Sequence, residues 1–489
     1  MKRQRGTGRV TLAAMAAMAA MCAVAALPGQ SWAAGEPNPY AFDSEAKTVT
    51  GAAVNTDGPP LNAGSTYKDT IKPGEKRYYR VDLDAKTNAY ISAVAVPKLA
   101  TKVSYADKLS VSIEDRSASK CGDEDAQFGS ASYARPVAAY AARTIEKDSS
   151  SSCRDAGAYY VLLKRSSEAT SSHEPWDVEI RFASEPGLKS QGPTAPPENW
   201  PSASPAAPGG GTGKRHGGTS FTDATSLKQG EWQDEITPGE TLFYRVPVDW
   251  GQQLFASADL GTSAAPDSAK SVSNALVLSL HNPARGYVDA ESGVYYDGKQ
   301  KSMALDPLPP VAYENRYDST NSTSAMRFAG WYYLSATLNP EVGKEYGNKP
   351  VPLTLRVNVE GEANGAPAYN GPAGDFQVTK DDQEAADSGK SAPEAAKSDT
   401  MQLVAAAGIG AGTVLVLGLG VWTLLARRRT AGAPAQGPAP AAPVAPVTDA
   451  AAQFPAQGPT AGQVPGGHGQ VPGQAPSRPP GQYGPPPTW

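Results

Sequence analysis

Histidine and cysteine are scarce in this chain of 489 residues, which has only four His and three Cys. This scarcity argues against a zinc site built from these residues and against a disulfide-rich scaffold. Charged residues make up only 19% of the chain, which argues against a basic nucleic-acid binder and a wholly disordered polyelectrolyte. We therefore expect no metal site, no cofactor and no nucleic-acid partner.

Motifs for catalysis are also missing. The sequence has no Walker loop, no dinucleotide-binding fingerprint and no H-E-x-x-H motif. His173 lies in a Ser-rich loop, His216 in a Gly-rich linker and His468 near the C-terminus, while His281 follows an apolar run. No G-x-S-x-G motif accompanies any of them, so a Ser-His-Asp triad is not indicated. The chain is predicted to be non-enzymatic, and a membrane-anchored hydrolase is the less favoured alternative.

Two long uncharged runs predict the topology. Residues 10–27 follow a basic start and precede small residues at Ser31 and Ala33, a pattern typical of a signal peptide cut after Ala33. Residues 401–426 carry no charge and are followed by three arginines at 427–429. A helix of this length, about 39 Å, exceeds the hydrocarbon core, and the arginines mark the cytoplasmic side. We expect a single-pass type I protein of the cell membrane.

The extracellular region carries a sequence duplication. At a constant offset of 165, residues 67–94 and 232–259 share 11 identities in 28 positions without a gap. Each copy has a Pro-Gly pair suited to a type II turn, followed by a run that alternates between apolar and polar residues. Further alternating runs and the absence of an amphipathic helix predict an all-β fold. The sequence therefore predicts two tandem jelly-roll or β-sandwich domains.

The repeated motifs resemble a known family. The order is Pro-Gly-Glu, then Tyr-Arg-Val, and later Ala-Gly-x-Tyr-Tyr, as in 73–75, 79–81 and 156–160 of the first copy. This order is similar to that of bacterial pre-peptidase C-terminal (PPC-type) domains, over about 66–185 and 220–360. The resemblance implies small extracellular β-sandwiches with an accessory or binding role, and it transfers no catalytic residues.

Four features of the two copies are candidate sites. Cys121 and Cys153 lie in the oxidising compartment, where a disulfide is favoured over two free thiols. The acidic run 123–125 is interpreted as a solvated loop rather than a calcium site. Trp250 has no aromatic counterpart in the first copy and is the better candidate for stacking on a ligand. Arg80 and Arg245 recur in both copies and are predicted to point outward, with pairing to a carboxylate favoured over ligand binding.

Glycine and proline are concentrated between and after the two copies, where flexible or disordered segments are expected. The expected organisation is a signal peptide at 1–33, an N-terminal extension at 34–65, a first β-sandwich at 66–185, a Pro/Gly linker at 186–217, a second β-sandwich at 218–362, a stalk at 363–401, a transmembrane helix at 402–426 and a disordered proline-rich cytoplasmic tail at 427–489.

The extracellular part has a net charge of about −12, a poor match for nucleic acid or anionic lipid. The function expected from these features is a surface binding or scaffold protein. It would interact with other envelope proteins outside the cell and through its tail with an unidentified partner inside. The alternative is a membrane protein that binds cell-wall polysaccharide.

Overall fold

The computed structural model describes residues 36–145, 151–190, 192–203, 205–206, 208, 212–397 and 417–425. The chain divides into two compact units, Met1–Ala411 and Gly412–Trp489. The predicted signal peptide and cytoplasmic tail lie outside the described residues.

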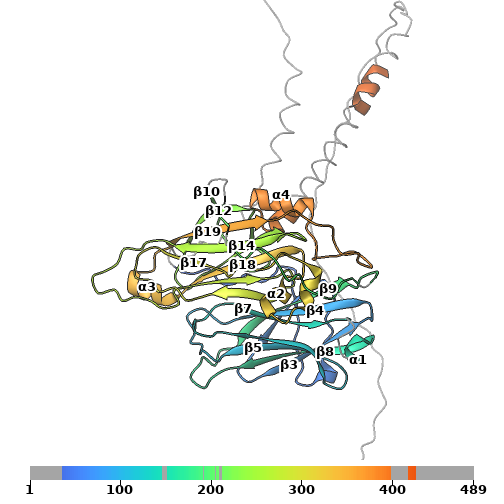
Figure 1. Cartoon of the computed structure of the whole chain (residues 1–489), viewed down its shortest axis with the longest axis horizontal. Helices are drawn as coiled ribbons and strands as arrows, with labels where there is room; N and C mark the ends of the chain where they lie inside the picture. The colour runs from blue at the N-terminus through green and yellow to red at the C-terminus, as the bar shows by residue number, and fades with distance from the viewer. Residues whose placement is uncertain are drawn as a thin grey trace, which may run out of the picture. The chain divides into compact units, whose positions relative to one another are not determined.

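The first unit is built mainly from four β-sheets (Figure 1). Sheets A and B come from residues 47–186, which we call the first half. Sheet A has the order β1 (Lys47–Thr48), β2 (Thr66–Ile71), β9 (Trp176–Pro186), β4 (Thr87–Val96) and β7 (Val137–Arg143). Sheet B has the order β3 (Lys76–Leu83), β8 (Gly157–Ser166), β5 (Lys108–Glu114) and β6 (Lys120–Gln127).

Sheets C and D come from the second half. Sheet C has the order β11 (Thr225–Ser226), β13 (Thr241–Val248), β18 (Gly330–Leu338), β15 (Leu276–His281) and β16 (Tyr287–Glu291). Sheet D has the order β10 (Thr212–Lys214), β12 (Gly230–Ile236), β19 (Val351–Glu360), β14 (Gln253–Leu260) and β17 (Lys301–Ala304). The helical elements are short: η1 (Asn55–Asp57), α1 (Ser151–Arg154), η2 (Tyr313–Tyr317), α2 (Asn321–Ala325), α3 (Pro340–Tyr346) and α4 (Lys380–Ser388).

The expected all-β sandwich character is confirmed by these sheets and their cores. One apolar cluster lies between sheets A and B and a second between sheets C and D. Alternation places Tyr79 and Val81 of β3 in the first core, and Tyr244 and Val246 of β13 in the second. Because successive side chains of a strand face opposite sides, the intervening residues point away from these cores.

The sequence repeat has a counterpart in the hydrogen bonding. The Tyr79 hydroxyl donates to Asp69 over 2.7 Å, and the equivalent Tyr244 hydroxyl donates to Asp234 over 2.6 Å. Each Pro-Gly pair forms a turn in which the glycine has a positive φ, +74° at Gly74 and +88° at Gly239. Glycine tolerates this conformation without a Cβ clash, which explains its presence at both turns.

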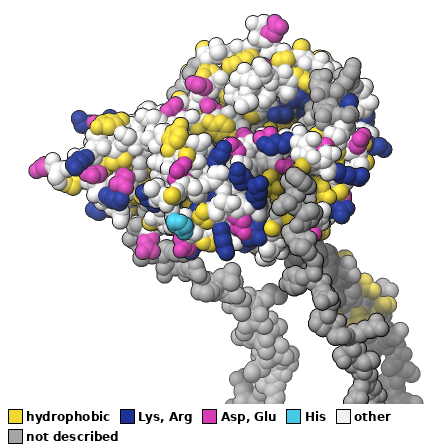
Figure 2. Space-filling model, turned by 90° about the horizontal axis from the view of Figure 1, so that it is seen from below, with side chains coloured by type: hydrophobic (Ala, Val, Ile, Leu, Met, Phe, Trp, Pro, Cys, Tyr) yellow, Lys and Arg dark blue, Asp and Glu magenta, His cyan; other side chains and the backbone are white. Residues whose placement is uncertain are grey.

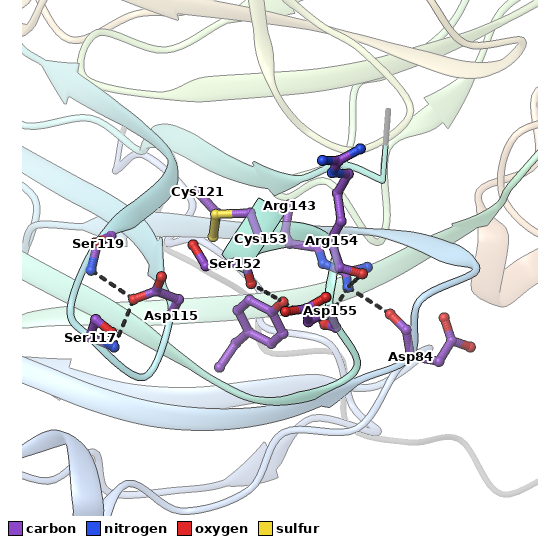
Figure 3. The surroundings of a disulfide bond; sticks show 11 residues. Asp84, Asp115, Ser117, Ser119, Cys121, Arg143, Ser152, Cys153, Arg154 and Asp155 are labelled. Carbon is purple, nitrogen blue, oxygen red and sulfur yellow. Dashed lines mark hydrogen bonds between the residues drawn. A yellow bond between two sulfur atoms is a disulfide. The ribbon is translucent and has the colours of Figure 1, made fainter. Parts of the chain in front are cut away.

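The expected disulfide between Cys121 and Cys153 is present, with the two Cα atoms 5.6 Å apart (Figure 3). The segment that it closes contains most of β6 and all of β7. Strand β7 is rich in alanine, which packs closely against the core. A run of alanines does not alternate between apolar and polar residues, so this strand is only weakly indicated in the sequence. Nearby, the buried Arg143 donates to four backbone carbonyls, including that of Asp84 at 2.7 Å and that of Asp155 at 2.9 Å.

The second compact unit is described only over residues 417–425, which are α-helical. Its apolar side chains, such as Leu419 and Trp422, are exposed. Within the described residues, no helix is both long and apolar enough to cross a membrane. Most of the predicted span, 402–416, lies outside those residues.

Candidate binding cleft at the junction of sheets A and C

Sheets A and C pack face to face through their outer surfaces, and we call this contact the junction. Val94 of β4 and Ala138 of β7 meet Phe243 of β13 in one buried cluster. Tyr90 of β4 packs edge-on against Phe328, with ring centroids 5.0 Å apart. These apolar side chains lie on the strand faces that point away from the two sandwich cores, where alternation predicts exposure to solvent. At the junction they are buried against the other half instead.

The first of two buried ion pairs crosses the junction between Glu179 of β9 and Arg285, and both side chains are almost fully buried. The hydroxyl of Tyr40, from the N-terminal extension, also donates to Glu179 over 3.2 Å. Burial opposes the charged guanidinium, but the adjacent Glu179 carboxylate outweighs this effect and raises the pKa of Arg285.

The second buried ion pair joins Glu185 of β9 to Arg316 of η2 over 2.8 Å, and neither side chain is exposed. Glu185 also accepts hydrogen bonds of 2.8 Å from Asn88, Tyr90 and Tyr369. Burial favours the neutral acid, but Arg316 and these donors hold the pKa of Glu185 below its usual range. The two halves are therefore joined by two buried ion pairs, in which the acids come from the first half and the arginines from the second.

Two segments outside the sheets cross the junction as straps. The N-terminal strap, residues 36–43, bonds to both halves, because Asn38 donates to Glu240 over 2.8 Å while Tyr40 donates to Glu179. The C-terminal strap, residues 363–397, belongs to the segment expected to be a stalk. It buries Phe376 against Phe328 and pairs Asp375 with Arg181 over 2.5 Å. These segments are packed parts of the molecule.

A cleft of about 820 Å³ opens where the N-terminal strap leaves the junction. Both halves and the strap form its walls. They contribute Glu36, Pro37, Pro39, Leu99, Ala100, Thr101, Lys102, Ser132, Tyr133, Ala134, Pro238, Gly239, Pro340, Glu341, Lys344 and Asn348. A mainly apolar pocket of about 300 Å³ adjoins the cleft and shares Pro39 and Leu99 with it. Because neither half alone forms these walls, the cleft depends on the junction.

One wall of the cleft carries backbone strain. Ala100 has a φ of +59°, a left-handed conformation that costs a residue with a Cβ about 1 kcal/mol. The residue lies in the loop between β4 and β5, beside Leu99 and Thr101. Strained backbone is often found at functional sites, which makes this loop a candidate recognition element.

The residues predicted as ligand-binding candidates do not meet at this cleft. Trp250 is only 3% exposed and packs in the core between sheets C and D, so a polysaccharide has no access to its ring. Arg80 is exposed and pairs with Asp82 over 2.7 Å, as the sequence suggested. Arg245 does not point into solvent as expected. It is buried with its guanidinium carbon 4.0 Å from the ring centroid of Trp331.

The cause of this difference between Arg80 and Arg245 is helix α4 of the C-terminal strap. The helix lies over β11 and β13, and its Asp382 accepts a 2.7 Å hydrogen bond from the Trp331 indole. Burial lowers the pKa of Arg245.

The exposed face that Figure 2 shows from below carries Lys and Arg interspersed with Asp and Glu, without one dominant sign of charge.

Two histidines have environments that shift their pKa values. His281 is buried next to Phe221, and desolvation lowers its pKa to about 4. His216 is exposed and contacts Asp234 over 2.9 Å, and this hydrogen bond raises its pKa. Within the described residues, no cluster of His, Cys, Asp and Glu is arranged to hold a metal ion.

The acidic run 123–125 is divided by the sheet geometry. Asp123 and Asp125 are exposed and pair with Lys120 and Lys108, at 2.9 and 2.5 Å. Glu124 points to the opposite side, where its carboxylate accepts the Tyr140 N–H over 2.8 Å. Desolvation raises the pKa of Glu124 to about 7, although Tyr140 and Arg327 oppose the shift. The interpretation of this run as a solvated loop is wrong, because the run lies within strand β6. Strand alternation was a signal that could have separated Glu124 from its two neighbours.

Comparison with known proteins identifies no family. No protein-family model and no curated protein matches the chain. The chain is similar to the CUB1-EGF-CUB2 domain of human MASP-1/3, at 6% identity over 60% of this chain and 99% of that one, with a TM-score of 0.14. It is also similar to the N-terminal CBM22-1-CBM22-2 tandem domain of Paenibacillus barcinonensis Xyn10C, at 11% identity over 60% and 85%, with a TM-score of 0.16. These low scores carry no argument about function.

Proposed function

We propose that this chain is a non-enzymatic, single-pass type I membrane protein that binds other envelope proteins outside the cell. In this proposal, the two sheet pairs are tandem PPC-like β-sandwich domains, a transmembrane helix at 402–426 anchors them, and the tail at 427–489 is cytoplasmic. The observation that carries the proposal is the cleft at the junction, which both halves build and which opens to solvent. A rigid site of this kind suits binding rather than flexible tethering.

The two buried ion pairs support this proposal. Removing one partner of such a pair leaves an uncompensated buried charge, at a cost of about 3–5 kcal/mol. With two such pairs at the junction, relative movement of the two halves is costly, so the cleft keeps its shape. Pre-organised walls lower the entropy cost of binding a partner.

Binding of cell-wall polysaccharide is the alternative. It rested on Trp250 as an accessible aromatic residue, and burial of this ring removes that basis. Tyr133, an aromatic residue of the cleft wall, is itself buried, and its ring lies beside the Arg135 guanidinium. The cleft walls described here therefore offer no flat aromatic surface for a sugar ring.

The test is cross-linking in intact cells with a membrane-impermeant, amine-reactive reagent and a tagged full-length chain. We expect a discrete product that contains a second envelope protein, and less of it when Lys102→Glu reverses a charge at the cleft. Lys349→Glu, on a residue that does not line the cleft, is the matched control. Retention of the tagged chain on purified cell wall, without any protein product, would instead support the polysaccharide alternative.

Topology needs a separate measurement. A reporter that functions only in the cytoplasm, fused after Arg429, is expected to be active. A reporter that functions only outside is expected to be inactive at the same position. The opposite pattern contradicts the type I orientation.

A further inference from the structure

The junction already holds one extended polypeptide, the N-terminal strap. Residues 36–42 have no regular secondary structure, and the strap contacts both halves through Asn38 and Tyr40. The backbone N–H of Asp43 donates to Glu179 over 3.1 Å. Tyr40 packs against Phe42 and Phe243, with ring centroids 5.1 and 5.8 Å apart. The surface between the sheets therefore accepts an extended chain with bulky side chains.

The 820 Å³ cleft continues this groove beyond the strap. Glu36, Pro37 and Pro39 belong both to the strap and to the cleft wall. If the signal peptide is cut after Ala33, only two residues precede Glu36, and they span about 7 Å when extended. They are too short to fill the cleft, so most of it stays open in the processed protein.

The composition of the walls indicates the chemistry of the occupant. Pro37, Pro39, Pro238 and Pro340 present rigid apolar rings, while Lys102 and others supply polar groups along the rim. The strap that already lies on this surface is extended and contains Pro37 and Pro39, so a further extended, proline-containing segment fits beside it. The backbone of such a segment loses little entropy on binding. The adjoining 300 Å³ pocket, lined by Val96, Pro97, Leu99 and Pro136 among others, has room for one bulky side chain.

From these observations we propose that the cleft binds an extended, proline-containing polypeptide segment of an envelope protein, with one bulky apolar side chain inserted into the 300 Å³ pocket. This inference rests on the proposed function and specifies its partner. The partner segment lies along the junction as a continuation of the groove that residues 36–43 occupy. The pocket supplies most of the binding energy, because buried apolar anchors dominate such interfaces.

The experiment is site-specific photo-cross-linking of the full-length chain in its native cells. A benzophenone amino acid replaces Thr101 in the cleft, or Tyr295, which is 59% exposed and lines neither the cleft nor the pocket. We expect a protein adduct from position 101 and none from position 295. Digestion and mass spectrometry are expected to map the adduct to a proline-containing terminus or linker of the partner.

Variants of the pocket test the apolar anchor. Leu99→Trp fills the pocket and is expected to lower the adduct yield by about ten-fold or more. Leu99→Asp, which places a carboxylate at the partly exposed pocket wall, is expected to do the same while leaving the protein folded. Tyr295→Asp is the matched surface control and is expected to leave the yield unchanged. An unchanged yield in both Leu99 variants overturns the anchor.

The possible failures are distinguishable. An adduct from position 101 that maps to a glycan, or to a surface inside a folded region, overturns the extended-segment inference and leaves a binding function in place. An absence of adducts at both positions, together with no product from amine-reactive cross-linking, counts against the proposed function itself.

Discussion

The side chain of Glu124 predicts a specific pH dependence of stability. Its folded-state pKa of about 7, against 4.5 for an ordinary glutamate, means that the folded protein binds this proton more tightly than the unfolded chain does. At about 1.36 kcal/mol per unit, the difference corresponds to about 3 kcal/mol. Because the side chain is only partly buried, we expect about 2 kcal/mol. The proton on Glu124 therefore adds about 2 kcal/mol to the free energy of unfolding near pH 4.5, and this stabilisation is lost as the pH rises to about 7.

Glu124→Gln keeps the shape of the side chain and removes its titration. The assay is urea unfolding of residues 34–397 of both proteins between pH 4.5 and 8. The measured quantity is the difference between their free energies of unfolding. The pH-dependent contributions of all other titratable groups are the same in both proteins, so they cancel in this difference. His281, for example, has a lowered pKa of about 4 and contributes a change of the opposite sign, with stability lost as the pH falls. We expect the difference to change by about 2 kcal/mol in favour of the variant as the pH rises. Parallel curves for the two proteins would refute the desolvation of this carboxyl group.

Further predictions concern other parts of the molecule. Arg316→Ala leaves Glu185 buried without its cation and is expected to lower the free energy of urea unfolding by about 3–5 kcal/mol, whereas Arg80→Ala, at an exposed pair, is expected to leave it almost unchanged. Equal effects would contradict the assigned burial. Cys153→Ser opens the disulfide and is expected to cost about 3–4 kcal/mol by calorimetry under oxidising conditions, and an unchanged Tm argues against the bond. Ala100→Gly relieves a left-handed backbone and is expected to raise stability in the same assay by up to about 1 kcal/mol, whereas a large loss would contradict the positive φ.

Local features were predictable from the sequence because their causes are local. The alternation that buries Tyr79 and Tyr244, and the glycines at the Pro-Gly turns, follow from strand geometry and steric limits within a few residues. The disulfide followed from two cysteines in a region that the sequence predicts to be extracellular. None of these inferences required knowledge of how the sheets pack.

The junction was not predictable, because the residues that form it occupy positions where the sequence pattern predicts exposure to solvent. Glu179 and Glu185 occupy polar positions of β9, where alternation predicts exposure, and both are fully buried by the other half. Arg245 was expected outside for the same reason and is covered by helix α4. The candidate cleft depends on this packing, so its lining residues come from segments that are distant in sequence and carry no common motif.

The ion pair between Glu179 and Arg285 has a consequence for how the duplicated sequence can change. Arg285 lies in the turn between β15 and β16, and Ala118 lies in the turn between β5 and β6 of the first half, with φ angles of +61° and +60°. Glu179 is the fourth residue of β9, and the fourth residue of β19, the middle strand of sheet D, is Thr354. The two copies have thus become complementary rather than interchangeable. If either copy is replaced with a duplicate of the other one, one charge of the pair stays buried without its partner, so both residues have to be changed together.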